Sequence, residues 1–184
     1  LAYLADVNDY PSNKMLLDMI PEQDRNSLSA KWLINKVEVL SHQIIGAECP
    51  GFTFIDSNGK SVSLKDFRGK IVVLDFCASW CGPCRADIPH LKEIYQHYHE
   101  KGFEMVSISI DDDKEAWLKA VKEEGMPWTQ AFGANGKSYT KECMKLFGVS
   151  GVPSCVLIDK DGRVLSTNAR GGWLSEKLMV LLGK

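Results

Sequence analysis

The stretch Phe76-Cys77-Ala78-Ser79-Trp80-Cys81-Gly82-Pro83-Cys84-Arg85 decides the fold of this chain. It follows the run 70–76, which is short, apolar and rich in β-branched residues and therefore predicts a buried strand. After it, apolar residues recur at helical spacing, at Ile88, Leu91, Ile94, Tyr95 and Tyr98. Cys81 is therefore expected where a strand ends and a helix begins.

That position has chemical consequences for Cys81. The N-terminus of a helix carries unpaired N–H groups and the positive end of the helix dipole, and both favour a thiolate over a thiol. Pro83 fits the first turn, where its missing N–H costs nothing. Cys84 lies one turn further along the same side, so the pair can close into a disulfide around Gly82 and Pro83. We expect Cys81 to attack and Cys84 to resolve.

The same two cysteines could instead form half of a zinc site or be inert thiols. Zinc needs about four ligands, usually from two such pairs or from added histidines. The chain has no second C-x-x-C pair, because Cys49, Cys143 and Cys155 are isolated in the sequence. We therefore expect redox chemistry and no metal site.

Trp80-Cys81-Gly82-Pro83-Cys84 resembles the active-site motif of the thioredoxin family. The longer string from Asp75 to Pro89 is similar to the TlpA/ResA-type branch, and within it to the Bacteroidetes type. The resemblance covers about residues 46–184. It implies a thiol:disulfide oxidoreductase tethered in the bacterial periplasm or cell envelope. It also implies that a signal peptide or lipid anchor has been removed from the chain, which begins with Leu1.

Length and composition bound the class of protein. A chain of 184 residues with 45% apolar and 25% charged residues allows one soluble globular domain and an appendage. The net charge of −2 argues against a nucleic-acid partner, and six cysteines are too few for a disulfide scaffold. No apolar run approaches the roughly 18 residues of a membrane-spanning helix. Contact with a membrane is expected only through the removed anchor.

Residues 1–45 predict a helical lead-in that the resemblance does not cover. Ser12 is expected to cap a short helix over 13–20. A longer helix is expected after Ser27 or Ser29, with Gly46 as its stop. Its apolar face comprises Ala30, Leu33, Ile34, Val37, Leu40, Ile44 and Ile45. We interpret the segment as a helix packed on its own domain or as the tail of a missing upstream domain, with docking or dimerisation as the alternative.

The elements of the thioredoxin-like domain, residues 46–184, follow from short patterns. The runs 52–55 and 61–64 flank Asn58-Gly59 and predict a hairpin ahead of the core. The run 103–110 predicts a strand that follows the first one through a helix, as in a right-handed parallel βαβ unit. The loop 111–113 is expected to be a solvated acidic cap of the next helix.

The last third of the chain predicts further elements of the same sheet. Residues 125–128 form a turn, and Trp128 lies in the core or lines the active-site face. The other predicted elements are a loop over 133–138, a short helix over 139–147 that holds a buried Cys143, strands over 155–159 and 164–166, and a terminal helix. The predicted fold is an α/β thioredoxin-like three-layer sandwich with a mixed central sheet, an N-terminal β-hairpin extension and the helical lead-in.

Two carboxylates accompany the cysteines. Asp75 interrupts an apolar strand, where burial is expensive and raises the pKa of a carboxyl group into the range useful for proton transfer. Asp87 follows Cys84 by three residues and lies one turn along the same face. By resemblance, Asp75 matches the buried acid of thioredoxins and Asp87 an acidic residue near the ResA active site. Either carboxylate could assist Cys84. Alternatively, both could be structural: Asp75 as an acid at a strand end that is hydrogen-bonded to a neighbour, and Asp87 as an acid early in a helix, where the helix dipole favours it.

A proline is expected to face the cysteines. Gly151-Val152-Pro153-Ser154 precedes the predicted strand 155–159. The resemblance implies that the Val152–Pro153 bond is cis and packs beside the disulfide. A cis bond would expose the backbone of Val152 for pairing with an extended substrate. Trp80 and Val152–Pro153 are therefore the expected substrate-binding surface.

The expected reaction is dithiol–disulfide exchange on protein substrates, without a cofactor. By resemblance, the electrons come from a membrane or periplasmic donor protein. A thiol peroxidase of the peroxiredoxin type is the first alternative, but its P-x-x-x-T-x-x-C motif is absent. A metal-binding or carrier module is the second, but copper-carrying relatives use C-x-x-x-C with a downstream His, and the spacing here is C-x-x-C.

Overall fold

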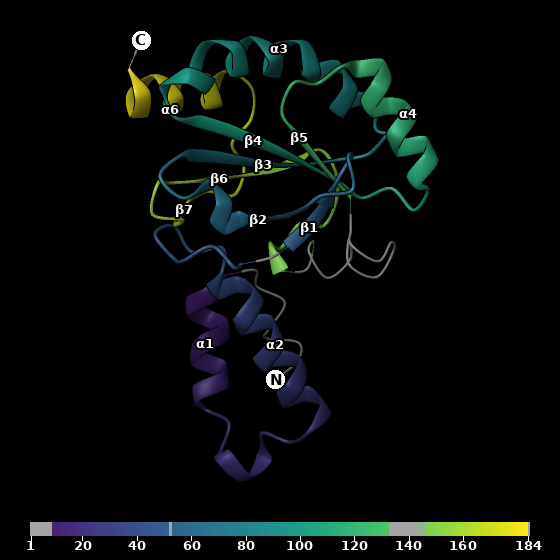
Figure 1. Ribbon diagram of the computed structural model, residues 1–184. Helices are drawn as coiled ribbons and strands as arrows, with labels where there is room; N and C mark the ends of the chain where they lie inside the picture. Colours follow the sequence, from purple (N-terminus) through teal and green to yellow (C-terminus); the bar gives the residue numbers. More distant parts are fainter. Residues whose placement is uncertain (1–8, 52, 133–143, 145, 184) are drawn as a thin grey trace.

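A seven-stranded mixed sheet forms the centre of the computed structural model, which describes residues 9–51, 53–132, 144 and 146–183 (Figure 1). The strands run in the order β2-β1-β5-β4-β3-β6-β7. Their bounds are β1 Thr53–Asp56, β2 Ser61–Ser63, β3 Ile71–Cys77, β4 Phe103–Ser109, β5 Thr129–Phe132, β6 Ser154–Ile158 and β7 Val164–Ser166. The central strands β3, β4 and β5 are parallel, and the outer strands join them antiparallel. The predicted mixed sheet is confirmed.

Helices form the layer above this sheet in Figure 1. They are α3 (Gly82–Tyr98), α4 (Lys114–Glu124) and α6 (Gly171–Leu182), with the short η4 (His99–Lys101) after α3. The opposite face is packed by η3 (Leu64–Phe67) and by Phe147 and Val149. Two hydrophobic cores, one on each face, thus hold three layers together, as the predicted α/β sandwich requires.

The central strand β3 serves both cores by alternation. Ile71 and Val73 pack under the helices, whereas Val72 and Leu74 pack into the core of the opposite face. Because successive side chains of a strand point to opposite faces, Asp75 points to the helix-covered face. The strand pattern therefore places this carboxyl group directly beneath the helix that carries the cysteine pair.

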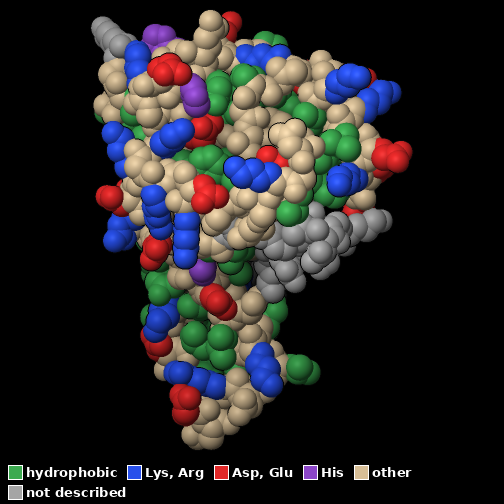
Figure 2. All heavy atoms as spheres, in the orientation of Figure 1, with side chains coloured by type: hydrophobic (Ala, Val, Ile, Leu, Met, Phe, Trp, Pro, Cys, Tyr) green, Lys and Arg blue, Asp and Glu red, His purple; other side chains and the backbone are tan. Residues whose placement is uncertain are grey.

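The N-terminal helices α1 (Tyr10–Asp18) and α2 (Leu28–Ser41), joined through η2 (Glu22–Asp24), extend away from the sheet (Figure 1). They pack on each other through Leu16, Leu33 and Val37. Figure 2 shows hydrophobic side chains left at the surface of this extension, and Met15, Met19 and Trp32 are 61%, 68% and 50% exposed. The division of the chain at residues 45 and 46 stays a prediction.

Two details of the lead-in differ from expectation. Asp9, not Ser12, caps the first helix: its carboxylate accepts the N–H of Ser12 at 3.0 Å, and Pro11 occupies the first turn. The proline favours this earlier start because its fixed φ suits the first helical positions. The long helix ends at Ser41, before the predicted stop, so Ile44 and Ile45 lie beyond it and are 39% and 72% exposed.

Other predictions for the lead-in and the hairpin hold. Ser27 caps α2 by accepting the N–H of Ala30 at 3.3 Å. The hairpin of β1 and β2 closes through Asp56, whose carboxylate accepts the N–H groups of Asn58 and Lys60 at 2.9 and 2.8 Å. Gly59 has φ +81°, a left-handed conformation that L-residues with a Cβ rarely adopt. The Asn58-Gly59 signal therefore identified the turn correctly.

The strand β5 was not predicted from the sequence. It is only four residues long and begins directly after the turn that ends at Trp128. It nevertheless joins β4 in parallel and β1 antiparallel, and so connects the hairpin to the rest of the sheet. The predicted loop over 133–138 and most of the predicted helix over 139–147, including Cys143, lie outside the described residues.

Candidate active site

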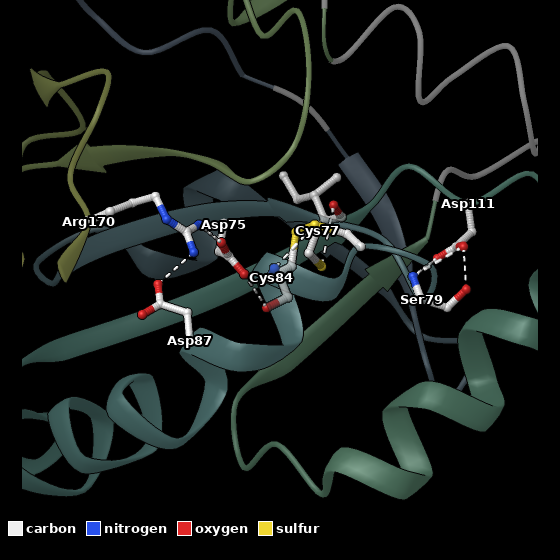
Figure 3. Close-up of a disulfide and its surroundings, with 10 residues drawn as sticks. Asp75, Cys77, Ser79, Cys84, Asp87, Asp111 and Arg170 are labelled. Atoms are coloured by element: carbon white, nitrogen blue, oxygen red, sulfur yellow. Dashed lines mark hydrogen bonds and ion pairs between the residues drawn. A yellow bond between two sulfur atoms is a disulfide. The ribbon is translucent and has the colours of Figure 1, made fainter.

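Cys81 and Cys84 lie where β3 passes into α3, and a disulfide joins them (Figure 3). Their Cα atoms are 5.3 Å apart. Cys81 is the N-cap of α3, and its sulfur accepts the backbone N–H of Cys84 at 3.2 Å. Gly82 and Pro83 form the first turn. The free donors of the helix are thus directed at the Cys81 sulfur, which favours a thiolate there after reduction.

The surface over the disulfide is formed by residues on both sides of it. Cys81 and Cys84 are only 4% and 5% exposed, whereas Trp80 is 67% exposed. Val152 packs against the cluster of Ala78, Cys81 and Cys84, and the Val152–Pro153 peptide bond is cis, as the resemblance implies. The indole of Trp80 is thus exposed next to a disulfide that exposes little of its own surface.

Asp75 lies behind the disulfide in an apolar layer and is 6% exposed. The register pairs it with Ser107 on β4 and with Cys155 on β6. The hydroxyl of Ser107 donates to Asp75 Oδ2 at 3.2 Å. Burial raises the pKa of Asp75 from 3.8 to about 6, although the Arg170 guanidinium and the Ser107 hydroxyl act in the opposite direction.

Arg170 connects the two predicted carboxylates. Its Nη1 lies 3.2 Å from Asp75 Oδ1, and its Nη2 lies 2.5 Å from Asp87 Oδ2 (Figure 3). The structure thus brings Asp75 and Asp87 together around one guanidinium. Arg170 occupies the N-cap position of α6, about a hundred residues beyond β3, and no local spacing in the sequence indicated this contact.

Asp87 continues the network toward the surface. His90 Nδ1 lies 3.8 Å from Asp87 Oδ1, and His90 Nε2 lies 3.2 Å from the hydroxyl of Ser175. The side chain of Asp87 is 23% exposed and that of His90 is 36% exposed. Asp87 is therefore the more solvated of the two carboxylates that share Arg170.

Ser107 and Trp128 orient the other side of Asp75. Trp128 is 4% exposed, and its indole N–H donates to the Ser107 hydroxyl oxygen at 2.8 Å. Because that oxygen already accepts from Trp128, its own hydrogen is free for Asp75. The predicted core position of Trp128 is confirmed. Ser107 could have been found from its polar place in the apolar run 103–110, two residues from the end of the strand.

Asp111 is buried beside the loop before Cys81, so the predicted solvated position of this residue is wrong. The expectation of a solvated acidic cap holds for Asp113, which accepts the N–H groups of Glu115 and Ala116. Asp111 instead is 2% exposed and accepts the Ser79 N–H at 2.9 Å and the Ser79 hydroxyl at 2.6 Å. It anchors the loop that leads to Trp80 and Cys81. The sequence did not indicate this role, because a run of three acidic residues is typical of an exposed helix cap.

Cys77 and Cys155, the two free cysteines closest to Asp75, are poor nucleophiles. Burial raises the pKa of Cys155 to about 12, and its sulfur contacts the carbonyl oxygen of Ala169 at 2.5 Å. Burial also raises the pKa of Cys77 well above its ordinary value, and Asp75 and Asp111 add to this. The thiols next to the disulfide therefore stay protonated where Cys81 would react.

A narrow cavity of about 30 Å³ lies behind the disulfide, between α3, α4 and the sheet. Its lining includes Asp75, Cys84, Asp111 and Gln130. The side-chain oxygen of Gln130 is buried, and no described residue donates a hydrogen bond to it. A cavity of this volume is large enough for one water molecule. Asp75 and Cys84 both lie on its lining.

The described part of the chain contains neither a cluster of metal ligands nor a helix suited to span a membrane. Over residues 9–51, 53–132, 144 and 146–183, no three His, Cys, Asp or Glu side chains gather as ligands for a metal ion. Within the same ranges, no helix combines the length and the apolar character that a membrane span requires.

Comparison with known proteins agrees with this geometry. The Redoxin family model matches residues 45–172. The thiol-disulfide oxidoreductase ResA of Bacillus thuringiensis subsp. konkukian is 37% identical over 140 residues, which are 76% of this chain and 78% of that protein. Tryparedoxin of Trypanosoma brucei brucei is 39% identical over 123 residues, 66% of this chain and 83% of that protein.

Solved structures give the same result. The thioredoxin domain of a thiol-disulfide oxidoreductase from Bacteroides vulgatus has a TM-score of 0.71 and 32% identity, over 76% of this chain and 98% of that one. A thiol:disulfide interchange protein from Bacteroides sp. has a TM-score of 0.70 and 32% identity, over 77% and 91%. With the disulfide at the N-terminus of α3, these matches show that the chain belongs to the Redoxin family and is a TlpA/ResA-like thiol-disulfide oxidoreductase of the thioredoxin superfamily.

Proposed function

We propose that this chain reduces disulfide bonds in other proteins, with Cys81 as the nucleophile and Cys84 as the resolving thiol. The observation that carries the proposal is the position of the pair: the Cys81 sulfur accepts a helix N-terminal N–H, and a buried carboxyl group lies behind Cys84. The first feature favours the attacking thiolate. The second supplies an acid–base group near the thiol that must react next.

The proposed reaction balances two electrons. The Cys81 thiolate attacks one sulfur of the substrate disulfide, that bond breaks, and the other substrate sulfur leaves as a thiolate. Cys84 then loses its proton and attacks the Cys81 sulfur of the mixed disulfide. The second substrate sulfur leaves as a thiolate, and the Cys81–Cys84 disulfide seen in the structure remains. The substrate has been reduced by two electrons and this protein oxidised by two.

Asp75 is the proposed proton acceptor for Cys84. Its pKa of about 6 leaves most of it ionised at neutral pH, so that it can take the proton that Cys84 must lose. The cavity lined by both residues provides the route. Asp87 contacts Arg170, which in turn contacts Asp75, and its role in the proton transfer is therefore proposed to be indirect.

The reduced state must be restored by a second partner. We propose a donor protein with a dithiol, in the membrane or the periplasm, that reduces the Cys81–Cys84 disulfide by the same exchange. The similarity to ResA proteins and the TlpA/ResA-type motif support a location in the bacterial cell envelope. Trp80 and Val152–Pro153 are proposed as the contact surface for both partners, because they surround the disulfide. A peroxidase or a metal carrier is not favoured.

Trapping of mixed disulfides tests this function. In Cys84→Ser the second step is removed, so Cys81 should remain joined to substrate proteins in the source cell. Cys81→Ser removes the first step and should trap none. The complexes are separated on non-reducing gels and released with dithiothreitol.

Cys155→Ser is the matched control, because the Cys155 thiol is buried and hydrogen-bonded in the core. Added to Cys84→Ser, it should leave the trapped set unchanged. Capture of the same proteins by Cys81→Ser and Cys84→Ser, or by neither, would overturn the assignment of Cys81 as the nucleophile.

A further inference from the structure

We infer that Arg170 is a positioning residue that holds Asp75 and Asp87 as a pair and decides how readily Asp75 gives up its proton. The inference deepens the proposed function, since it rests on Asp75 as the proton acceptor of Cys84. It assigns a role to a residue from the far end of the chain. It also assigns Asp87 a role opposite in sign to that of Arg170.

The geometry is that of one cation between two anions. Arg170 Nη1 lies 3.2 Å from Asp75 Oδ1 and its Nη2 lies 2.5 Å from Asp87 Oδ2, so each carboxylate meets a different nitrogen (Figure 3). The Arg170 side chain is 19% exposed and that of Asp75 is 9% exposed, which limits screening by water. A planar guanidinium can bridge two acceptors in this way, whereas an ammonium group acts as a point charge.

The pair of carboxylates competes for this charge. When Asp75 is ionised, two negative charges share one positive charge, and the group carries a net −1. When Asp75 is protonated, Arg170 and Asp87 neutralise each other. Asp87 therefore opposes ionisation of Asp75 twice, by its own negative charge and by its hold on Arg170.

The remaining neighbours of Asp75 leave this competition largely undisturbed. Among the described residues, the ionisable groups that face Asp75, Asp87 or the cavity beside them come from four places. They are Cys77 on β3, Cys155 on β6, Arg85 and His90 on α3, and Asp111 and Glu124 across the cavity. Burial raises the pKa of Cys77 and of Cys155, so both thiols are neutral where Asp75 titrates. Arg85 and Glu124 are paired with each other at 2.6 Å. His90, beside Asp87, is controlled by substitution below.

The test is the titration of the Asp75 carboxyl carbon, followed by carbon-13 NMR in the oxidised full chain. Arg170→Gln should raise the midpoint of this titration by about 1 to 3 pH units, the usual effect of a close opposite charge. Asp87→Asn should lower it. Arg170→Lys keeps the positive charge but lacks the two guanidinium nitrogens that contact both carboxylates. It should give a midpoint between those of the wild type and Arg170→Gln.

Arg170→Gln and Asp87→Asn each remove one charge, and they should shift the Asp75 titration midpoint in opposite directions. A merely structural role of Arg170 would not produce such opposite shifts. If Arg170→Gln leaves the midpoint in place, or if Asp87→Asn moves it in the same direction, the inference is overturned. Arg163→Gln is the matched control, because Arg163 donates to the carbonyl of Gly46 on another part of the molecule and should leave the midpoint unchanged. Repeating the Arg170 and Asp87 substitutions in a His90→Gln background removes the imidazole beside Asp87 as a source of the shifts. If Arg170→Gln does not fold, Arg170→Lys and Asp87→Asn still decide the sign.

A kinetic arm separates this inference from the proposed function. Arg170→Gln should move the pH profile of mixed-disulfide resolution upward by the same amount as the NMR midpoint, and Asp75→Asn should abolish that dependence. Opposite NMR shifts without any change in the kinetic profile would keep Arg170 as the residue that sets Asp75. Such a result would refute only the proposal that Asp75 accepts the proton of Cys84.

Discussion

Asp75 and Asp111 are two buried carboxylates on the lining of one cavity, yet their surroundings differ in kind. They are 6% and 2% exposed. Asp111 accepts hydrogen bonds from the Ser79 N–H and from the hydroxyls of Ser79 and Ser109, all within nearby loop and strand-end segments. Asp75 accepts one hydrogen bond from the Ser107 hydroxyl and pairs with Arg170, which also pairs with Asp87. Equal burial therefore does not imply equal function. Three hydrogen bonds let Asp111 hold its loop in place, whereas Asp75 has fewer partners for its charge, and burial raises its pKa.

The largest expected effect comes from removing the anchor. Asp111→Ala leaves the Ser79 N–H and two hydroxyls without their acceptor in a closed site. Each buried unsatisfied group costs about 1–3 kcal/mol, so we expect a loss of about 3–5 kcal/mol in the free energy of unfolding. Urea denaturation of the oxidised protein measures this loss.

The exchange rate should fall in the same variant, because the loop that leads to Trp80 and Cys81 loses its attachment. Asp112→Ala, at the exposed neighbour, is the control and should cost several-fold less. Equal losses from the two substitutions would mean that Asp111 is not an anchor, and the contrast with Asp75 would disappear.

The second prediction concerns the pH dependence of stability. The pKa of Asp75 is raised from 3.8 to about 6, mainly by burial, so the folded state binds this proton more tightly than the unfolded state. The contribution of Asp75 to stability is therefore fully present below the unfolded pKa and is lost as the pH rises from about 4 to about 6. The full penalty above that range is about 3 kcal/mol.

Asp75→Asn cannot titrate and should lack this contribution. The difference between the unfolding free energies of the variant and the wild type should therefore change by about 3 kcal/mol between pH 4 and pH 7.5, in favour of the variant at the higher pH. Denaturation series at fixed pH values measure it. A difference that stays constant over this range would mean that Asp75 does not titrate there.

The same contrast explains what could be predicted from the sequence. The position of Asp75 follows from local information, since an apolar strand fixes both its burial and, by alternation, the face that it occupies. The cysteine pair at the start of a helix and the hairpin at Asn58-Gly59 are also local patterns, whereas the mixed sheet was predicted with the help of the family resemblance. The local elements were predicted correctly because each is encoded within about ten neighbouring residues.

The partners of Asp75 are not encoded in this way. Arg170 reaches it from the loop before α6, and Ser107 from the adjacent strand, so both contacts arise from tertiary packing. Asp111 was misread because a run of three acids is typical of a solvated cap, and only the folded loop shows that its first member turns inward. The strand β5 was missed because four residues after a turn give no reliable period.

The smallest expected effect lies in the hydrogen bonds that set Asp75 apart from Asp111. Ser107→Ala removes the only hydroxyl donor that the described residues give to Asp75 and should raise the midpoint of its carboxyl titration by about one pH unit. Trp128→Phe keeps that hydroxyl but removes the indole N–H that donates to it at 2.8 Å. A hydroxyl that accepts one hydrogen bond donates another more strongly, so this loss should raise the midpoint by a few tenths of a unit.

Carbon-13 NMR of the Asp75 carboxyl group resolves shifts of this size, and the double substitution shows whether the two residues act in series. If Trp128 acts only through Ser107, the double variant titrates like Ser107→Ala alone. A further upward shift in the double variant would mean that Trp128 acts on Asp75 through packing instead, because its ring then changes the burial of the carboxyl group. The order Trp128 to Ser107 to Asp75 would be wrong in that case, although the raised pKa of Asp75 would remain.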